Sequence, residues 1–173
     1  MPAFWYPPRC ATEEPRLYIP RWSEEIISEM VHTLESEVGL APEKTAHLVS
    51  ELKKHFGDAW VTGYAPLIGS MTNHSKDRHV VAAAVRCGAE MIVTYNKRHI
   101  PAAALEPWGL EVLRPSAFLR LQYDLNPATV VDKLHAQARN LGRSLPQQLK
   151  VMRLAVPSFV DVIVQGLGIT IED

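Results

Sequence analysis

The segment from Asn73 to Asn96 constrains the fold most, because it has the pattern of one helix that leads directly into one buried strand. Apolar residues recur at helical spacing before Gly88, which ends the predicted helix. The apolar run that begins at Met91 is typical of a strand in a parallel sheet. Ligands of open α/β sheets bind beyond the carboxyl ends of the strands, so we expect Asn96 in a site, and Asp77 near the helix start could share that rim.

Composition indicates a globular protein with room for one domain and an appendage. The chain has 173 residues, of which 47% are apolar and 21% charged. The net charge of -1 gives no overall field that favours nucleic acid, so any RNA contact must come from a local basic patch. Cys10 and Cys87 form no paired motif and suit free thiols in a cytoplasmic protein. We expect neither a signal peptide nor a membrane span.

Helices alternate with short apolar runs along most of the chain, which predicts an α/β protein with a parallel sheet. The first 16 residues carry four prolines and are expected to form an irregular lead-in. The further elements that we expect are a strand over Leu17–Pro20, a helix capped by Ser23, a helix from Pro42 to Gly57, a short edge strand over Ala59–Gly63, a strand over Leu110–Leu113 and a short helix capped by Ser116.

The end of the chain is predicted to be helical. Asn126 and Pro127 have the pattern of a helix cap followed by proline in the first turn, and that helix stops near Gly142. Ser144 is expected to cap a further helix to about Val156, and the apolar residues that follow can pack back on the domain. We therefore expect a domain over residues 17–121 and a C-terminal helical extension over residues 126–173.

The order of elements around Asn96 resembles the second half of a PIN-domain nuclease. In that family a helix is followed by Gly-Ala-(Asp/Glu), an apolar strand, Val-Thr and a polar residue; here these are Gly88-Ala89-Glu90, the run from Met91, Val93-Thr94 and Asn96. The resemblance extends from Leu17 to Phe118 and implies a PIN-like three-layer fold with a parallel sheet. The helices after Asn126 resemble an extension carried by long PIN toxins of the VapC kind.

The resemblance implies a metal site at the rim of the sheet. In PIN nucleases three or four carboxylates hold Mg²⁺ or Mn²⁺, and the ions activate water and stabilise charge on the reacting phosphate. Glu29 corresponds to the family's early-helix Glu, Asp77 to the Asp that opens the later helix, and Asn96 to the position after the strand. Glu29 and Asp77 are thus the implied metal ligands, and Asn96 completes the catalytic set. Each also has an ordinary interpretation: a solvated Glu, a helix cap and a turn residue.

Several of the family's acids are missing from this chain. The family's Asp-Pro-Asp-Asp-like cluster is replaced by His74-Ser75-Lys76-Asp77, and a related subgroup has an Asp where this chain has His99. No apolar strand ending in Asp precedes Leu17, and Glu13 and Glu14 do not replace it because Pro15 follows them. We therefore expect the opening strand and its Asp to be missing and catalysis to be impaired.

Basic residues gather on the two loops predicted to line the cleft. Lys76, Arg78, Lys97 and Arg98, with three neighbouring histidines, could bind RNA phosphates, although charged loops are often only solvated. A zinc site formed by His74, His79 and Asp77 is another interpretation, but its spacing matches no standard motif.

Family membership would imply a bacterial type II toxin that cuts RNA and is held inactive by a cognate antitoxin. A homodimer is compatible with this interpretation. The alternative is a noncatalytic module that keeps antitoxin or RNA contacts without cleavage. A third hypothesis, an unrelated α/β enzyme, requires a deep apolar cavity at the rim beside Asn96.

Overall fold

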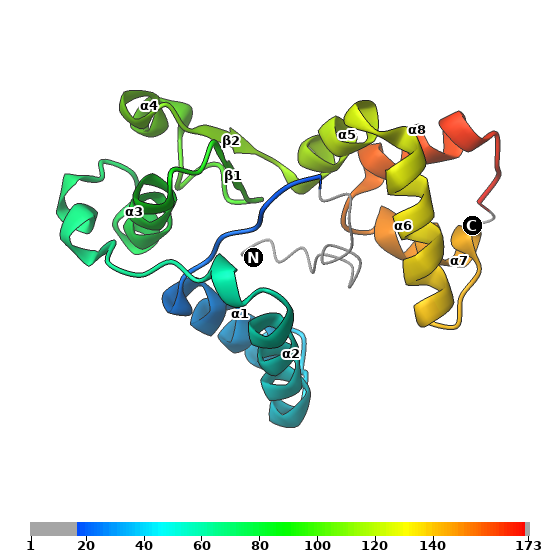
Figure 1. Ribbon diagram of the computed structural model, residues 1–173, viewed down its shortest axis with the longest axis horizontal. Coiled ribbons are helices and arrows are strands. Elements are labelled where there is room, and N and C mark those ends of the chain that lie inside the picture. Colours follow the sequence, from blue (N-terminus) through cyan, green and yellow to red (C-terminus); the bar gives the residue numbers. More distant parts are fainter. Residues whose placement is uncertain (1–16, 172–173) are drawn as a thin grey trace. The chain divides into compact units, whose positions relative to one another are not determined.

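The computed structural model describes residues 17–171, which divide into two compact units. One unit comprises residues 19–113, and the other comprises residues 114–171 together with residues 17 and 18. Figure 1 labels their helices and strands in chain order. The predicted irregular lead-in, with Glu13 and Glu14, lies outside the described residues. No helix in the described part of the chain has both the length and the apolar character needed to cross a membrane.

The first unit opens with two helices that local sequence signals begin. Helix α1 (Glu24–Ser36) starts where the Ser23 side chain accepts a hydrogen bond from the Ile26 N–H at 3.3 Å, as predicted. Helix α2 (Pro42–His55) starts at a proline, which fits the first turn because its missing N–H has no partner there. The rest of this unit contains η2 (Gly57–Ala59), η3 (Ala65–Ser70), η4 (Ser75–Asp77), α3 (Arg78–Cys87), β1 (Met91–Val93), α4 (Ala102–Leu105), η5 (Glu106–Trp108) and β2 (Glu111–Leu113).

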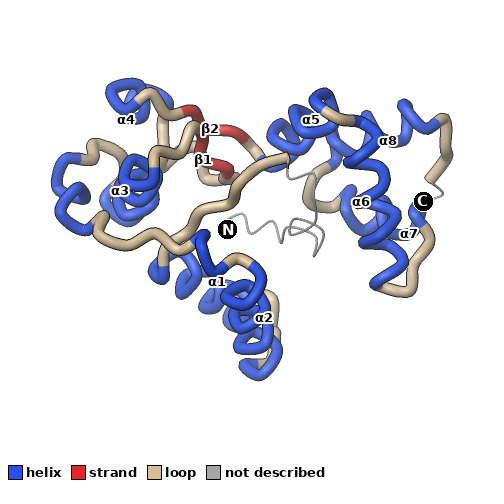
Figure 2. Tube along the Cα trace, viewed as in Figure 1, coloured by secondary structure: helices blue, strands red, loops and turns tan. Residues whose placement is uncertain are grey.

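Strands β1 and β2 form a two-stranded parallel sheet, as Figure 2 shows in red. Ile92 lies opposite Val112 in the register of the pair. Helix α3, which packs against β1, ends at Gly88, whose φ of +65° is a conformation that favours glycine. The predicted helix, the two strands and their parallel pairing are therefore confirmed, and the chain has the mixed α/β character that we expected.

One apolar cluster holds α3 to the sheet. Val81 and Ala82 are almost completely buried on α3, and they meet Ile92 of β1 and Val112 of β2 in this cluster. The small alanine side chains let the helix approach the sheet closely. The other members of the cluster come from the segments around the sheet: Met71, Ala84, Ile100, Leu105 and Leu110.

Three local predictions were wrong. Leu17–Pro20 forms no strand, and Tyr18 instead packs edge-on against Phe118 with ring centroids 5.1 Å apart. The expected edge strand over Ala59–Gly63 is reduced to one parallel bridge between Trp22 and Trp60. The 3₁₀ turn η2 ends at Ala59 and so includes the first residue of the expected strand.

The cap predicted at Ser116 was also wrong. Helix α5 (Pro115–Leu125) begins two residues earlier than a cap at Ser116 implies, since Pro115 has the fixed φ that suits the first helical position, and Arg114 is the cap.

The second unit is helical. It contains α5, α6 (Pro127–Asn140), α7 (Leu145–Arg153) and α8 (Pro157–Leu167). The predicted caps are confirmed: Asn126 accepts from the Thr129 N–H at 3.0 Å, and Ser144 forms a reciprocal capping box with Gln147. Residues Phe159, Val160 and Ile163 of α8 are buried.

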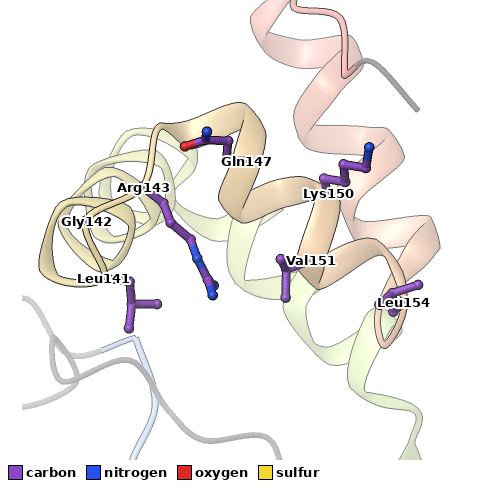
Figure 3. A pocket seen from close by; sticks show the side chains of 7 residues that line it. All are labelled: Leu141, Gly142, Arg143, Gln147, Lys150, Val151 and Leu154. Atoms are coloured by element: carbon purple, nitrogen blue, oxygen red, sulfur yellow. The ribbon is translucent and has the colours of Figure 1, made fainter.

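A shallow hollow of about 640 Å³ lies on the second unit between the end of α6 and α7 (Figure 3). Leu141, Val151 and Leu154 give it an apolar lining, and Arg143 and Lys150 add two cations. None of the residues predicted to form the metal or RNA site lines this hollow.

The buried face of α3 generates a stability prediction. Replacing Val81, which is 1% exposed, by alanine should lower the free energy of unfolding by about 2 kcal/mol, because buried methyl groups are lost and a cavity remains. The matched control is Val38→Ala, since Val38 is 58% exposed in the same unit and should change the free energy by less than about 0.5 kcal/mol. Urea unfolding of both variants measures the difference, and equal losses would contradict this packing.

Candidate functional site

Asp77 and Asn96 meet at the rim of the sheet. Asp77 is the cap residue of α3, yet its side chain makes no capping hydrogen bond. Its Oδ2 instead accepts a hydrogen bond from the Asn96 Nδ2 at 3.2 Å. Asn96 follows β1 and is fixed by its own N–H, which donates to the Thr94 Oγ1 at 3.0 Å. The structure thus brings these two predicted site residues into contact, and Asp77 does more than cap a helix.

Two histidines complete this group. The His99 Nδ1 lies 2.7 Å from the same Asp77 Oδ2, which is a short hydrogen bond between the ring and the carboxylate. His74 stacks on His99 with ring centroids 4.0 Å apart and planes 11° apart. The His74 N–H also donates to the His99 carbonyl at 3.0 Å, so a backbone bond joins the two loops that carry the rings.

One ligand atom from each of His74, Asp77 and His99 can be chosen so that all three lie within 4.8 Å of one another. Such a group could hold a metal ion, and we name it the HDH cluster. Sequence reasoning placed both histidines among the basic residues of the loops, and it placed His74 in an alternative zinc site with His79 and Asp77. The available signal was the position of His99, three residues after Asn96, where a related subgroup of the PIN family has an Asp.

Glu29 lies on α1, and its nearest charged partner is His79 of α3, which is not a member of the HDH cluster. Its Oε2 is 3.6 Å from the Nε2 of His79, which is too long for a hydrogen bond. His79 is buried, and its Nε2 has no hydrogen-bond partner among the described residues. Among the described residues the possible metal ligands that gather are His74, Asp77 and His99, so His99 takes the place that the zinc interpretation gave to His79.

Electrostatics link Glu29 to Asp77. Partial burial raises the pKa of the Glu29 carboxyl above its ordinary value of 4.5, the His79 ring acts to lower it, and the negative charges of Asp77 and Glu25 raise it further. Asp77 is therefore near enough to influence Glu29, while the only ion pair of Glu29 that the structure describes is with His79. Whether the two carboxylates share an ion stays a prediction.

The four predicted RNA-binding residues surround the HDH cluster in sequence. Lys76, Lys97 and Arg98 are exposed. Arg78 is half-buried, and its Nε donates to the Asn73 carbonyl at 3.2 Å, so part of this guanidinium already supports the loop. The exposed cations have the character that phosphate contacts need, and their role in RNA binding stays a prediction.

Over 67 residues the chain is 54% identical to "Putative ribonuclease VapC50" of Mycobacterium tuberculosis (strain ATCC 25618 / H37Rv). This stretch is VapC-like. It spans 39% of this chain and 40% of that relative. No family model matches the chain, and no solved structure matches it. The resemblance to VapC-like PIN ribonucleases is therefore confirmed over this stretch, and what the whole protein does is a matter for proposal.

The raised pKa of Glu29 predicts how stability depends on pH. Well below pH 4.5 the carboxyl is protonated in both the folded and the unfolded protein, so wild type and Glu29→Gln should be equally stable. As the pH rises from 4.5 through the raised pKa, the unfolded chain releases this proton first, and the wild type should lose stability relative to Glu29→Gln.

Thermal melts of the two proteins across this pH range measure the effect. Glu106→Gln, a change at an exposed residue of η5, serves as the control and should follow the wild type. A Glu29→Gln variant that becomes less stable than wild type as the pH rises would show that the ionised carboxylate is stabilised instead.

Proposed function

We propose that this chain is a VapC-like PIN-domain protein of a type II toxin–antitoxin system, derived from metal-dependent endoribonucleases, and that its own catalysis is impaired. The convergence of Asp77, Asn96 and His99 beyond β1 is the observation that carries the proposal. A PIN-like three-layer fold over residues 17–121 with a helical extension over residues 126–173 is part of it. The partners are a cognate antitoxin and RNA in the cytoplasm, and a homodimer is compatible with the proposal.

The residues at the rim do not fit the Mg²⁺ site that the family implies. Mg²⁺ prefers oxygen ligands in octahedral geometry, whereas the HDH cluster offers one carboxylate and two ring nitrogens. Glu29, the other implied ligand, pairs with His79. In the family a bound Mg²⁺ or Mn²⁺ ion would supply water activation and charge stabilisation. With so few acids, we expect these ions to bind weakly here.

The residues of the chain itself are suited to holding RNA. The exposed ammonium groups of Lys76 and Lys97 and the guanidinium of Arg98 can contact phosphate oxygens, which supply most sequence-independent affinity. Asn96 and His99 hold the Asp77 carboxylate in a fixed orientation, and the three cations are close to these residues in the sequence. This arrangement supports RNA binding at the rim whether or not a strand is cut.

A noncatalytic module that binds RNA or antitoxin is the second candidate. Two observations favour it: the Asp77 Oδ2 already accepts hydrogen bonds from two side chains, and Lys76 adds positive charge where the family usually has an acid. The two candidates share the binding role and differ in whether residual cleavage exists. An assay of cleavage therefore separates them.

We expect the unaltered chain to show little cleavage of labelled RNA with Mn²⁺, and His99→Asp to raise it by about tenfold or more. The substitution replaces a ring nitrogen with the carboxylate that the related subgroup carries, and groups around a metal site commonly change activity by that factor. Gel analysis of the digest, with EDTA and Asp77→Ala as controls, measures both effects. Strong EDTA-sensitive cleavage by the unaltered chain, lost in Asp77→Ala, would falsify the impaired-enzyme proposal, whereas no gain in His99→Asp favours the noncatalytic module.

RNA binding gives an independent prediction. Lys97→Ala combined with Arg98→Ala should weaken binding of a single-stranded RNA and reduce the slope of log affinity against log salt by about 1 to 1.5, because each phosphate contact to a single strand contributes about 0.7. Lys44→Ala combined with Lys54→Ala removes two exposed cations from α2 and should leave that slope unchanged. Fluorescence anisotropy at several salt concentrations gives the slopes, and equal effects of the two double variants would locate the RNA elsewhere.

A further inference from the structure

The donor atoms of the HDH cluster suggest a metal preference that differs from the one the family implies. We propose that His74, Asp77 and His99 bind one divalent transition-metal ion of the Zn²⁺ class and discriminate against Mg²⁺. The inference rests on the proposed function only because both concern the same rim of the sheet. It states which class of metal ion binds at this rim. It can be tested without RNA and without any cleavage.

The geometry allows all three side chains to reach one ion. Zn²⁺ with bonds of about 2.0 to 2.1 Å holds neighbouring ligand atoms about 3.3 Å apart in a tetrahedral site. In the structure the chosen donor atoms are within 4.8 Å of one another, and the His99 Nδ1 and Asp77 Oδ2 are 2.7 Å apart. To face one ion, the two rings would turn out of their parallel stack, and an ion on the His99 Nδ1 would replace its 2.7 Å hydrogen bond to the Asp77 Oδ2. The fourth position of the ion would then be open to water or a phosphate oxygen.

The backbone holds the donors in place before any ion binds. The His74 N–H donates to the His99 carbonyl at 3.0 Å, and the His99 N–H donates to the Asn96 carbonyl at 3.2 Å. Because these bonds do not involve the rings, each imidazole can turn towards an ion while its loop stays fixed. The Lys76 N–H makes a weak contact with the His74 Nδ1, at 3.3 Å on an exposed ring, and an ion bound at this nitrogen would replace that hydrogen bond.

The carboxylate is also oriented as a metal ligand usually is. Carboxylates that bind metals commonly accept a hydrogen bond from a neighbouring side chain, and Asn96 makes this bond to Asp77 at 3.2 Å. Both described bonds of this carboxylate end on Oδ2, and Oδ1 has no hydrogen-bond partner among the described residues. Asp77 therefore keeps an oxygen for an ion even while Asn96 holds it.

The chemistry of two nitrogens and one carboxylate selects the ion. Imidazole suits Zn²⁺, Co²⁺ and Ni²⁺, whose affinities for such sites exceed that of Mn²⁺, whereas Mg²⁺ requires oxygen ligands and releases its water reluctantly. A single negative charge is also too little to attract Mg²⁺ strongly from water. Thus the cluster can still bind an ion, but because His74 and His99 stand where the family has acids, the preferred ion is different.

The test is direct titration of the full chain with Zn²⁺ and, separately, with Mg²⁺ by calorimetry, and with Co²⁺ by visible absorption. We expect one Zn²⁺ per chain, an affinity for Mg²⁺ at least 100-fold lower, and Co²⁺ bands of a low-coordinate site that Zn²⁺ abolishes. His74→Ala and His99→Ala should each lower Zn²⁺ affinity at least tenfold. His135→Ala, a change at an exposed histidine of α6, is the matched control and should bind like the wild type.

Thermal melts without metal establish that the variants are folded, and His74→Ala is the safer variant because its ring is exposed. Absence of stoichiometric Zn²⁺ binding, equal affinity in His74→Ala and wild type, or equal affinity for Mg²⁺ and Zn²⁺ would each overturn the inference. These results are independent of the cleavage assay. A chain that binds Zn²⁺ but cuts no RNA keeps the inference, and a chain that cuts RNA with Mn²⁺ but binds no Zn²⁺ loses only the inference.

Discussion

The packing of α3 against β1 and β2 determines where the candidate site can form. Val81 and Ala82 bury one face of the helix against the sheet, and this contact fixes the helix start relative to the strand end. Asp77 lies at the start of α3 and Asn96 lies beyond the end of β1, so the two side chains meet. The apolar cluster, which contains no site residue, thus sets the separation of polar groups at the rim.

Signals that act over a few residues allowed much of the fold to be predicted. Apolar periodicity identified α3, Gly88 ended it, and the cap residues Ser23, Asn126 and Ser144 marked three helix starts. The parallel pairing of β1 and β2 followed from the short connection through a helix. Local patterns were less informative where pairing depends on distant residues: Trp60 has a strand-like neighbourhood, yet it finds one bridge partner in Trp22.

The site could be predicted only in part, for a related reason. That Asp77 and Asn96 share a rim follows from helix and strand order, and the structure places them in contact. The contact between His99 and Asp77 depends on the path of the loop after Asn96, which no periodicity describes. In the same way, the approach of His79 to Glu29 joins side chains from α1 and α3, which are far apart in the sequence, and it was not predicted from the sequence.

The backbone bond between the His74 N–H and the His99 carbonyl has a consequence for how such a site can evolve. Any residue except proline can supply the N–H, and any residue can supply the carbonyl, so the two loops stay joined whatever side chains stand at these positions. A carboxylate can therefore be exchanged for an imidazole by a single substitution without loss of the scaffold. The two loops therefore form a scaffold on which the set of metal-binding side chains can change during evolution while this backbone contact is kept.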